Sequence, residues 1–235
     1  MSHPHMLTLF KPKKISEINF FETSNLRSSS ERKRKIRDFV PNQSKQEDFQ
    51  KYGYSYFDDI NYGVGYGGYH YDGRYAECVK KIINYYKLNP GDSVLEIGCA
   101  KGFLIYEFYK KGMSIAGIDL SSYAVKNALT ETKQFLVQGS CEQLPWKTDS
   151  FDLVISKDTL PHLSLEQLPL AISEVERVCR NNNIFLEIGV TDDAQGRELM
   201  KKWDETQQTI QSASWWRQLL NSCNFRGQIN LKSQF

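Results

Sequence analysis

The chain has 235 residues, of which 40% are hydrophobic, which is enough for one α/β domain with an extension. Its formal net charge of +2 argues against general binding to polyanions, and it has no long apolar run or signal-peptide pattern that would indicate a membrane span or export. Five cysteines, odd in number and without a C-x-x-C pair, favour reduced thiols in the cytoplasm over a disulfide framework or a metal site.

Residues 1–50 are expected to form a polar, basic extension outside the core domain. A serine triplet at 28–30 is followed by a run of mostly basic residues at 31–37. A solvated helix or a flexible arm is the favoured interpretation, because the rest of the chain is not basic. The alternative is that this arm contacts nucleic acid or another anionic ligand.

Residues 51–75, here called the tyrosine-rich segment, alternate tyrosines with glycines in a pattern that fits neither a strand nor a helix. Such a loop can present tyrosine hydroxyls and ring faces to a ligand, and its glycines allow it to be tightly shaped. We predict that the segment forms a lid; packing on the domain edge is the alternative. Arg74, near its end, is suited to holding a carboxylate of a cofactor or substrate.

Residues 76–235 are predicted to form the main domain. Apolar runs and apolar residues at helical spacing alternate along this part of the chain. Strands are expected at 93–97, 114–120, 134–138, 152–156, 184–188 and 227–231, and helices at 75–86, 102–111, 121–129, 164–179, 192–203 and 214–220. This alternation predicts an α/β fold, a Rossmann-like doubly wound and mostly parallel sheet with helices on both faces. No seventh strand is evident.

The loop after the first of these strands has the composition of a nucleotide-type site. It contains Gly98 and Gly102 between a buried strand and a helix start, where backbone N–H groups are unpaired. Ala100 and Phe103 stand where a dinucleotide-binding G-x-G-x-x-G loop has its second and third glycines. Glu96, just before the loop, would repel a pyrophosphate and attract a cationic ligand.

Residues 96–102 resemble motif I of the class I S-adenosylmethionine-dependent methyltransferases. Residues 116–121, 139–146 and 150–163 resemble three further motifs of the family, in the family's order. Residues 69–74 read Tyr-x-Tyr-Asp-Gly-Arg, similar to a subset of bacterial methyltransferases that often belong to surface-polysaccharide or secondary-metabolite pathways. The resemblance implies S-adenosylmethionine as the cofactor and no metal.

The resemblance also implies which residues bind the cofactor. Asp119, at a strand end about twenty residues after the glycine loop, would accept both ribose hydroxyls. Ser140 replaces the family's acid that receives the adenine amino group, so this contact is expected to be weaker, neutral or water-mediated. Cys141 is expected to pack on the adenine. The predicted cofactor-binding residues are Tyr66, Tyr71, Arg74, Glu96, Gly98, Ala100, Gly102, Asp119, Leu120, Ser140, Cys141, Glu142 and Lys157.

The expected reaction is an in-line displacement by an acceptor atom, for which alignment matters most. His162, in the loop of the fourth motif, is the first candidate for a general base, because imidazole exchanges protons near neutral pH. A packing role for His162 is an equally acceptable interpretation. Lys157, Asp158 and, from the tyrosine-rich segment, His70 are the other candidates.

The expected acceptor is a small polar molecule such as a sugar, a sugar nucleotide or a natural-product intermediate, methylated on O or N. One alternative is an RNA or protein methyltransferase that uses the basic arm. Another is a non-catalytic, cofactor-binding partner subunit. An NAD-binding oxidoreductase is disfavoured by the glycine spacing. We expect a cytoplasmic protein without nucleic-acid or membrane partners; the sequence leaves the oligomeric state open, with a homodimer as one option.

Overall fold

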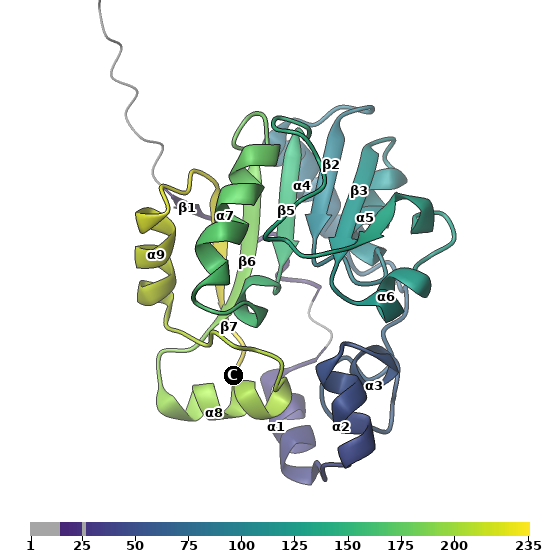
Figure 1. Cartoon of the computed structure of the whole chain (residues 1–235), viewed down its shortest axis with the longest axis vertical. Coiled ribbons are helices and arrows are strands. Elements are labelled where there is room, and N and C mark those ends of the chain that lie inside the picture. The colour runs from purple at the N-terminus through teal and green to yellow at the C-terminus, as the bar shows by residue number, and fades with distance from the viewer. Residues whose placement is uncertain (1–14, 25–26) are drawn as a thin grey trace, which may run out of the picture.

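The structure is a computed structural model that describes residues 15–24 and 27–235, and its centre is a seven-stranded sheet (Figure 1). The strand order is β1-β7-β6-β5-β2-β3-β4, and all neighbouring strands are parallel. The strands are β1 (Ser16–Glu17), β2 (Ser93–Ile97), β3 (Ser114–Asp119), β4 (Leu136–Gln138), β5 (Leu153–Lys157), β6 (Ile184–Val190) and β7 (Gln228–Ser233). The six strands expected after residue 90 are therefore confirmed.

Helices cover both faces of the sheet, which confirms the predicted doubly wound fold (Figure 1). On β2, Val94 packs in the core shared with α4 and α5, whereas Leu95 and Ile97 pack in the core shared with α7 and α9. A strand buried on both faces is the rule in parallel sheets. The helices along the sheet are α4 (Ala76–Tyr86), α5 (Phe103–Tyr109), α6 (Ser122–Lys126), α7 (Gln167–Val178) and α9 (Ala213–Ser222).

The direction of chain winding reverses between β2 and β5, which are paired at the middle of the sheet. From β2 the chain continues to β3 and β4 on one side, and from β5 it continues to β6 and β7 on the other. In open α/β sheets, ligands bind outside the carboxyl ends of the strands at such a switch point. The loops that follow β2, β3 and β5 therefore meet where a ligand is expected.

A second layer of helices lies below the sheet in Figure 1. It consists of α1 (Ser29–Asp38), α2 (Gln43–Gln50), α3 (Tyr54–Phe57) and α8 (Ala194–Trp203). Side-chain caps begin three of them: Ser28 accepts from the N–H of Glu31, Asn42 from that of Lys45, and Asp193 from that of Gly196. The segment from α2 to α3 and the loop after α8 reach the ends of the strands, as described below.

The N-terminal segment differs from the expectation of an extension outside the domain. Residues 1–14 and 25–26 lie outside the described part of the chain, but Ser16 pairs with Gln228 at the edge of the sheet. Phe20 and Phe21 are 3% and 1% exposed, and the ring of Phe20 lies 4.9 Å from that of Phe185. The seventh strand, which the sequence did not reveal, is thus β1, whose two residues carry no periodic signal.

We expect the substitution Phe21→Ala to lower the free energy of unfolding by about 3–5 kcal/mol, because it leaves a cavity against Phe185 in the core. Urea unfolding followed by circular dichroism measures this change. Val40→Ala is the matched control, since Val40 is 82% exposed and its truncation is expected to cost less than about 0.5 kcal/mol. Equal effects of the two substitutions would show that the N-terminal segment is not part of the core.

Three further observations concern membrane spans, metal sites and disulfides, which the composition disfavoured. Within residues 15–24 and 27–235, no helix is long and apolar enough to cross a membrane. In the same ranges, no three His, Cys, Asp or Glu side chains are grouped so that they could hold a metal ion. All five cysteines are free thiols.

Candidate functional site

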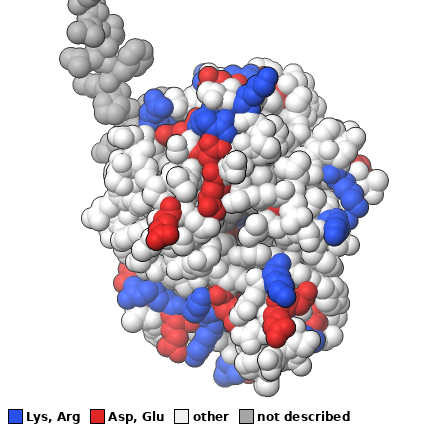
Figure 2. Space-filling model, viewed as in Figure 1, with Lys and Arg blue, Asp and Glu red and all other residues white. Residues whose placement is uncertain are grey.

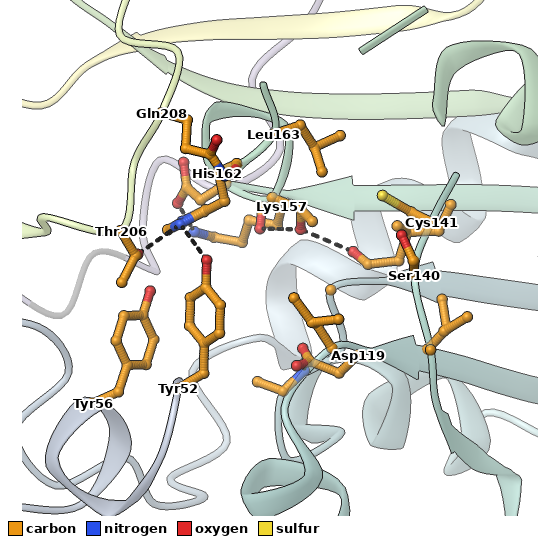
Figure 3. A pocket seen from close by; sticks show the side chains of 18 of the residues that line it. Tyr52, Tyr56, Asp119, Ser140, Cys141, Lys157, His162, Leu163, Thr206 and Gln208 are labelled. Carbon is orange, nitrogen blue, oxygen red and sulfur yellow. Dashed lines mark hydrogen bonds and ion pairs between the residues drawn. The ribbon is translucent and has the colours of Figure 1, made fainter. Parts of the chain in front are cut away.

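A cavity of about 550 Å³ lies at the carboxyl edge of the sheet (Figure 3). This volume is in the range of small-molecule sites. Its lining residues come from the ends of β2, β3 and β5, from the loops after these strands and after β4, from the start of α7, from the segment 50–66 and from the loop after α8. They are Gln50, Tyr52, Tyr56, Phe57, Tyr66, Ile97, Gly98, Ala100, Ile118, Asp119, Leu120, Gly139, Ser140, Cys141, Glu142, Lys157, Asp158, Thr159, His162, Leu163, Gln167, Glu205, Thr206 and Gln208.

The glycine loop between β2 and α5 requires its glycines for packing as well as for access. Gly98 and Gly102 have φ values of +70° and +75°, in the left-handed region that favours glycine. A Cβ atom on Gly98 would overlap the side chain of Thr159, and one on Gly102 would lie 2.9 Å from Thr132 Oγ1. Gly98 and Ala100 line the cavity, whereas Gly102 lies outside its wall and begins α5.

Glu96 lies beneath this loop and does not line the cavity. Its Oε2 accepts a hydrogen bond of 3.0 Å from the backbone N–H of Ile105, in the first turn of α5. Burial raises the pKa of Glu96 well above its usual value, and the charge of Asp119 adds to this effect. The contact that the structure shows is therefore a cap on α5, and a contact with a cationic cofactor stays a prediction.

Asp119, at the end of β3, points into the cavity (Figure 3). Its Oδ2 accepts from the backbone N–H of Ala100 at 2.7 Å, and its Oδ1 accepts from that of Ser121 at 2.8 Å. Burial raises the pKa of Asp119, while these two N–H groups act in the opposite direction. A carboxylate has about four acceptor positions, so both oxygens retain capacity for hydroxyl donors from a ligand.

Near Asp119, the lining of the cavity includes the apolar side chains of Leu120 and Cys141 beside the polar side chains of Ser140 and Glu142. Leu120 is 60% exposed, and Cys141 lies close by in the loop after β4. Burial raises the pKa of the Cys141 thiol to about 12, so this thiol stays protonated and is suited to packing. Ser140 Oγ lies 2.9 Å from Glu142 Oε1, which also accepts from Gln167 at 2.7 Å.

His162 lies across the cavity from Asp119, held by polar side chains (Figure 3). Its Nδ1 is 2.9 Å from Thr206 Oγ1 and 3.4 Å from the hydroxyl of Tyr52. Thr206 donates its own proton to Asp204 Oδ1 at 2.5 Å, so it accepts from His162 Nδ1. With the proton on Nδ1, the lone pair of the neutral ring is on Nε2, which lies 3.8 Å from Asp204 Oδ2.

Lys157 and Asp158, the other base candidates of this loop, form a buried ion pair. Lys157 Nζ lies 2.7 Å from Asp158 Oδ2 and 3.1 Å from Glu187 Oε1. Burial alone would lower the pKa of Lys157, but the two acids raise it well above its usual value. For Asp158, burial alone would raise the pKa, but Lys157, Lys232 and Arg32 together lower it. Both groups stay charged near neutral pH, so His162 is the better base.

The tyrosine-rich segment is tied to the loops of the sheet. Lys101 Nζ, in the glycine loop, contacts Asp58 Oδ1 at 2.6 Å and the carbonyl oxygen of Tyr69 at 3.1 Å. Ser121 Oγ donates to the carbonyl oxygen of Tyr52 at 2.6 Å. The segment thus contributes to the lining of the cavity and contacts the loops after β2 and β3, and its opening as a lid stays a prediction.

The structure does not bring all predicted site residues to this cavity. His70 is exposed, with its Nδ1 3.0 Å from the carbonyl oxygen of Gly68. The hydroxyl of Tyr71 donates to the buried carboxylate of Glu107 in α5 at 2.5 Å, and Tyr71 does not line the cavity. Arg74 lines a second, smaller cavity. Of the lining residues, sequence reasoning singled out none of Thr206, Gln208, Tyr52 or Tyr56; the first two lie in an irregular loop without a local pattern.

The all-parallel, seven-stranded sheet with helices on both faces is the Rossmann-like α/β fold of methyltransferases. The crystal structure of YcgJ from Bacillus subtilis is similar over 62% of this chain and 66% of that one, with a TM-score of 0.53 and 22% sequence identity. At this identity the likeness concerns the fold alone.

Residues 95–186 match the family model described as "Methyltransferase domain". An uncharacterized protein of Methanocaldococcus jannaschii is 34% identical over 49% of this chain and 44% of its own length. An uncharacterized methyltransferase of Synechocystis is 33% identical over 42% of this chain and 47% of its own. The chain thus spans less than half of these relatives. The matched residues 95–186 include the loops after β2, β3 and β5, which contribute to the lining of the cavity.

Proposed function

We propose that the protein transfers a methyl group from S-adenosylmethionine to an O or N atom of a small polar acceptor. The observation that carries this proposal is the position of Asp119, which lies in a cavity of about 550 Å³ opposite His162. The two neighbouring hydroxyls of the ribose of S-adenosylmethionine would donate to the acceptor positions that remain on Asp119, and its adenine would pack beside Leu120 and Cys141.

When bound, S-adenosylmethionine supplies a methyl group on a positively charged sulfur. The acceptor atom forms a bond to the methyl carbon as the carbon–sulfur bond breaks, and S-adenosylhomocysteine leaves. The protein contributes mainly alignment and exclusion of water, and Tyr52, Tyr56 and Tyr66 close the cavity for this purpose. His162 Nε2 would accept the proton that the acceptor loses. Thr206, whose hydroxyl donates to Asp204 Oδ1, favours the ring tautomer with the proton on Nδ1.

A small acceptor is favoured over RNA because the cavity is covered and the charge is mixed. The layer of α1, α2 and α8 shows Lys and Arg beside Asp and Glu in Figure 2, without a face of one sign in this view. Of the basic run, Lys33, Arg34 and Arg37 are exposed. A polymer substrate would need a continuous basic surface leading to the cavity.

Calorimetric titration with S-adenosylmethionine, S-adenosylhomocysteine and, as a control, NAD tests the cofactor. We expect micromolar dissociation constants for the first two and no binding of NAD. Absence of binding to both cofactor forms would overturn the proposal. Binding of both without methyl transfer to any acceptor in a screen of sugars, sugar nucleotides and natural-product intermediates would favour the non-catalytic partner subunit.

The RNA or protein alternative is tested by replacing Lys33, Arg34 and Arg37 together with serine. Deleting residues 1–50 is unsuitable, because Phe20 and Phe21 belong to the core. A small-molecule enzyme should keep its KM in the triple variant, whereas a polymer enzyme should lose affinity in a salt-dependent way.

A further inference from the structure

A second cavity of about 120 Å³ adjoins the first, and five residues line both: Tyr56, Tyr66, Lys157, Asp158 and His162. Its lining includes the cationic side chains Arg27, Arg32, Arg74, Lys157 and Lys232, and the acidic side chains Asp158 and Asp204. The cations come from four distant parts of the sequence. Their convergence beside the candidate base suggests a place for an anionic group.

Arg32 offers the clearest unused donor in this cavity. Its Nη1 donates to the carbonyl oxygen of Gln234 at 3.2 Å, and its guanidinium lies 5.7 Å from the ring centroid of Trp203. Its Nε is buried and has no hydrogen-bond partner among the described residues. A buried donor without a partner destabilises the folded state, so an acceptor atom from a ligand would stabilise this arrangement.

Arg74 lines the same cavity. Its Nε and Nη2 bind the carboxylate of Asp72 at 2.8 Å and 2.5 Å, and its side chain is 13% exposed. A guanidinium carries five N–H donors in a fixed plane, so Nη1 remains for a further acceptor. Arg27 differs, since it donates to the carbonyl oxygens of Gly65 and Tyr66 and so positions the tyrosine-rich segment.

Two side chains that line the cavity also carry buried acceptors. Asp158 Oδ1 and Gln207 Oε1 are buried without a hydrogen-bond partner among the described residues. These oxygens disfavour a bare anion and favour an anion that also carries hydroxyl groups. A small hydroxylated molecule with a phosphate or a carboxylate matches both sets of groups.

We infer that the acceptor is a small hydroxylated anion, whose phosphate or carboxylate binds Arg32 and Arg74 in the second cavity. This inference rests on the proposed function. Because His162 lines both cavities, an anion held there would place a neighbouring hydroxyl or amine at the base and facing the methyl donor. The second cavity then selects the acceptor, and the first binds the cofactor.

The test is calorimetric titration of the protein, saturated with S-adenosylhomocysteine, with inorganic phosphate and with lactate. Phosphate represents a phosphate group and lactate a carboxylate. The probe with the lower dissociation constant identifies which of the two groups the acceptor carries. We expect saturable binding of at least one probe, weakened at least tenfold by Arg32→Gln and by Arg74→Gln. Both variants should keep the affinity for S-adenosylhomocysteine and the unfolding midpoint of the unaltered protein, which excludes misfolding.

Arg37→Gln is the matched control, because Arg37 lies on the same helix with a side chain that is 74% exposed. No saturable binding of either probe, or equal affinities in Arg32→Gln and Arg37→Gln, would overturn the inference. Such a result, together with intact binding of S-adenosylhomocysteine, would leave the proposed function in place. Loss of S-adenosylhomocysteine binding by the unaltered protein would instead overturn the proposed function.

Discussion

Replacing Asp119 with alanine is expected to weaken the binding of S-adenosylhomocysteine by about a hundredfold or more. Hydrogen bonds to a charged group contribute about 1.5–3 kcal/mol each, and the substitution removes two expected bonds to ribose hydroxyls. It also frees the backbone N–H groups of Ala100 and Ser121, which the carboxylate now fixes at 2.7 Å and 2.8 Å. Calorimetric titration measures the change.

Two further variants separate the role of the charge from that of the shape. Asp119→Asn has the same shape and keeps one acceptor oxygen, so we expect a smaller loss than for Asp119→Ala. Glu131→Ala removes an exposed acid and should leave the affinity unchanged. If Asp119→Ala bound the ligand as well as the unaltered protein does, the cofactor would have to bind elsewhere.

The parts of the fold that the sequence predicted are those whose signals are local. The strand 93–97, its glycine loop and the helix after it follow one another within twenty residues, and each carries its own apolar period or turn residue. The alternation of side chains along this strand also indicates which face of the sheet Glu96 occupies. Residues two apart on a strand share a face, so Glu96 lies with Val94 on the side of α5 and caps that helix.

The features that the sequence did not predict depend on contacts between distant segments. β1 is a two-residue strand whose only signal is its partner β7. The groups around His162 come from residues 52, 204 and 206, and no spacing in the sequence connects them. The same is true of the second cavity, where Arg32 and Arg74 meet. Tertiary packing of distant segments brings the side chains around His162 and those of the second cavity together.

Replacing His162 with glutamine is expected to lower turnover by about 10²–10⁴-fold, the usual contribution of a general base. Glutamine fills a similar space and can still bond to Thr206, but it cannot take a proton. Because the imidazole lies across the cavity from Asp119, the affinity for S-adenosylhomocysteine should stay within about twofold. The measurement is formation of S-adenosylhomocysteine with the acceptor that the screen identifies, alongside calorimetric titration of the variant.

Thr206→Val distinguishes a base from a packing residue at this position. It removes the oxygen 2.9 Å from His162 Nδ1, so the neutral ring is free to place its proton on Nε2 and lose its basic atom there. If His162 is a base, Thr206→Val would show a partial loss of turnover and an altered pH profile; if His162 only packs, the variant would show neither.

His70→Gln is measured in parallel. A fall in turnover in that variant alone would show that the base comes from the tyrosine-rich segment. Unchanged turnover in His162→Gln would mean that the acceptor needs no base, so that alignment alone carries the reaction.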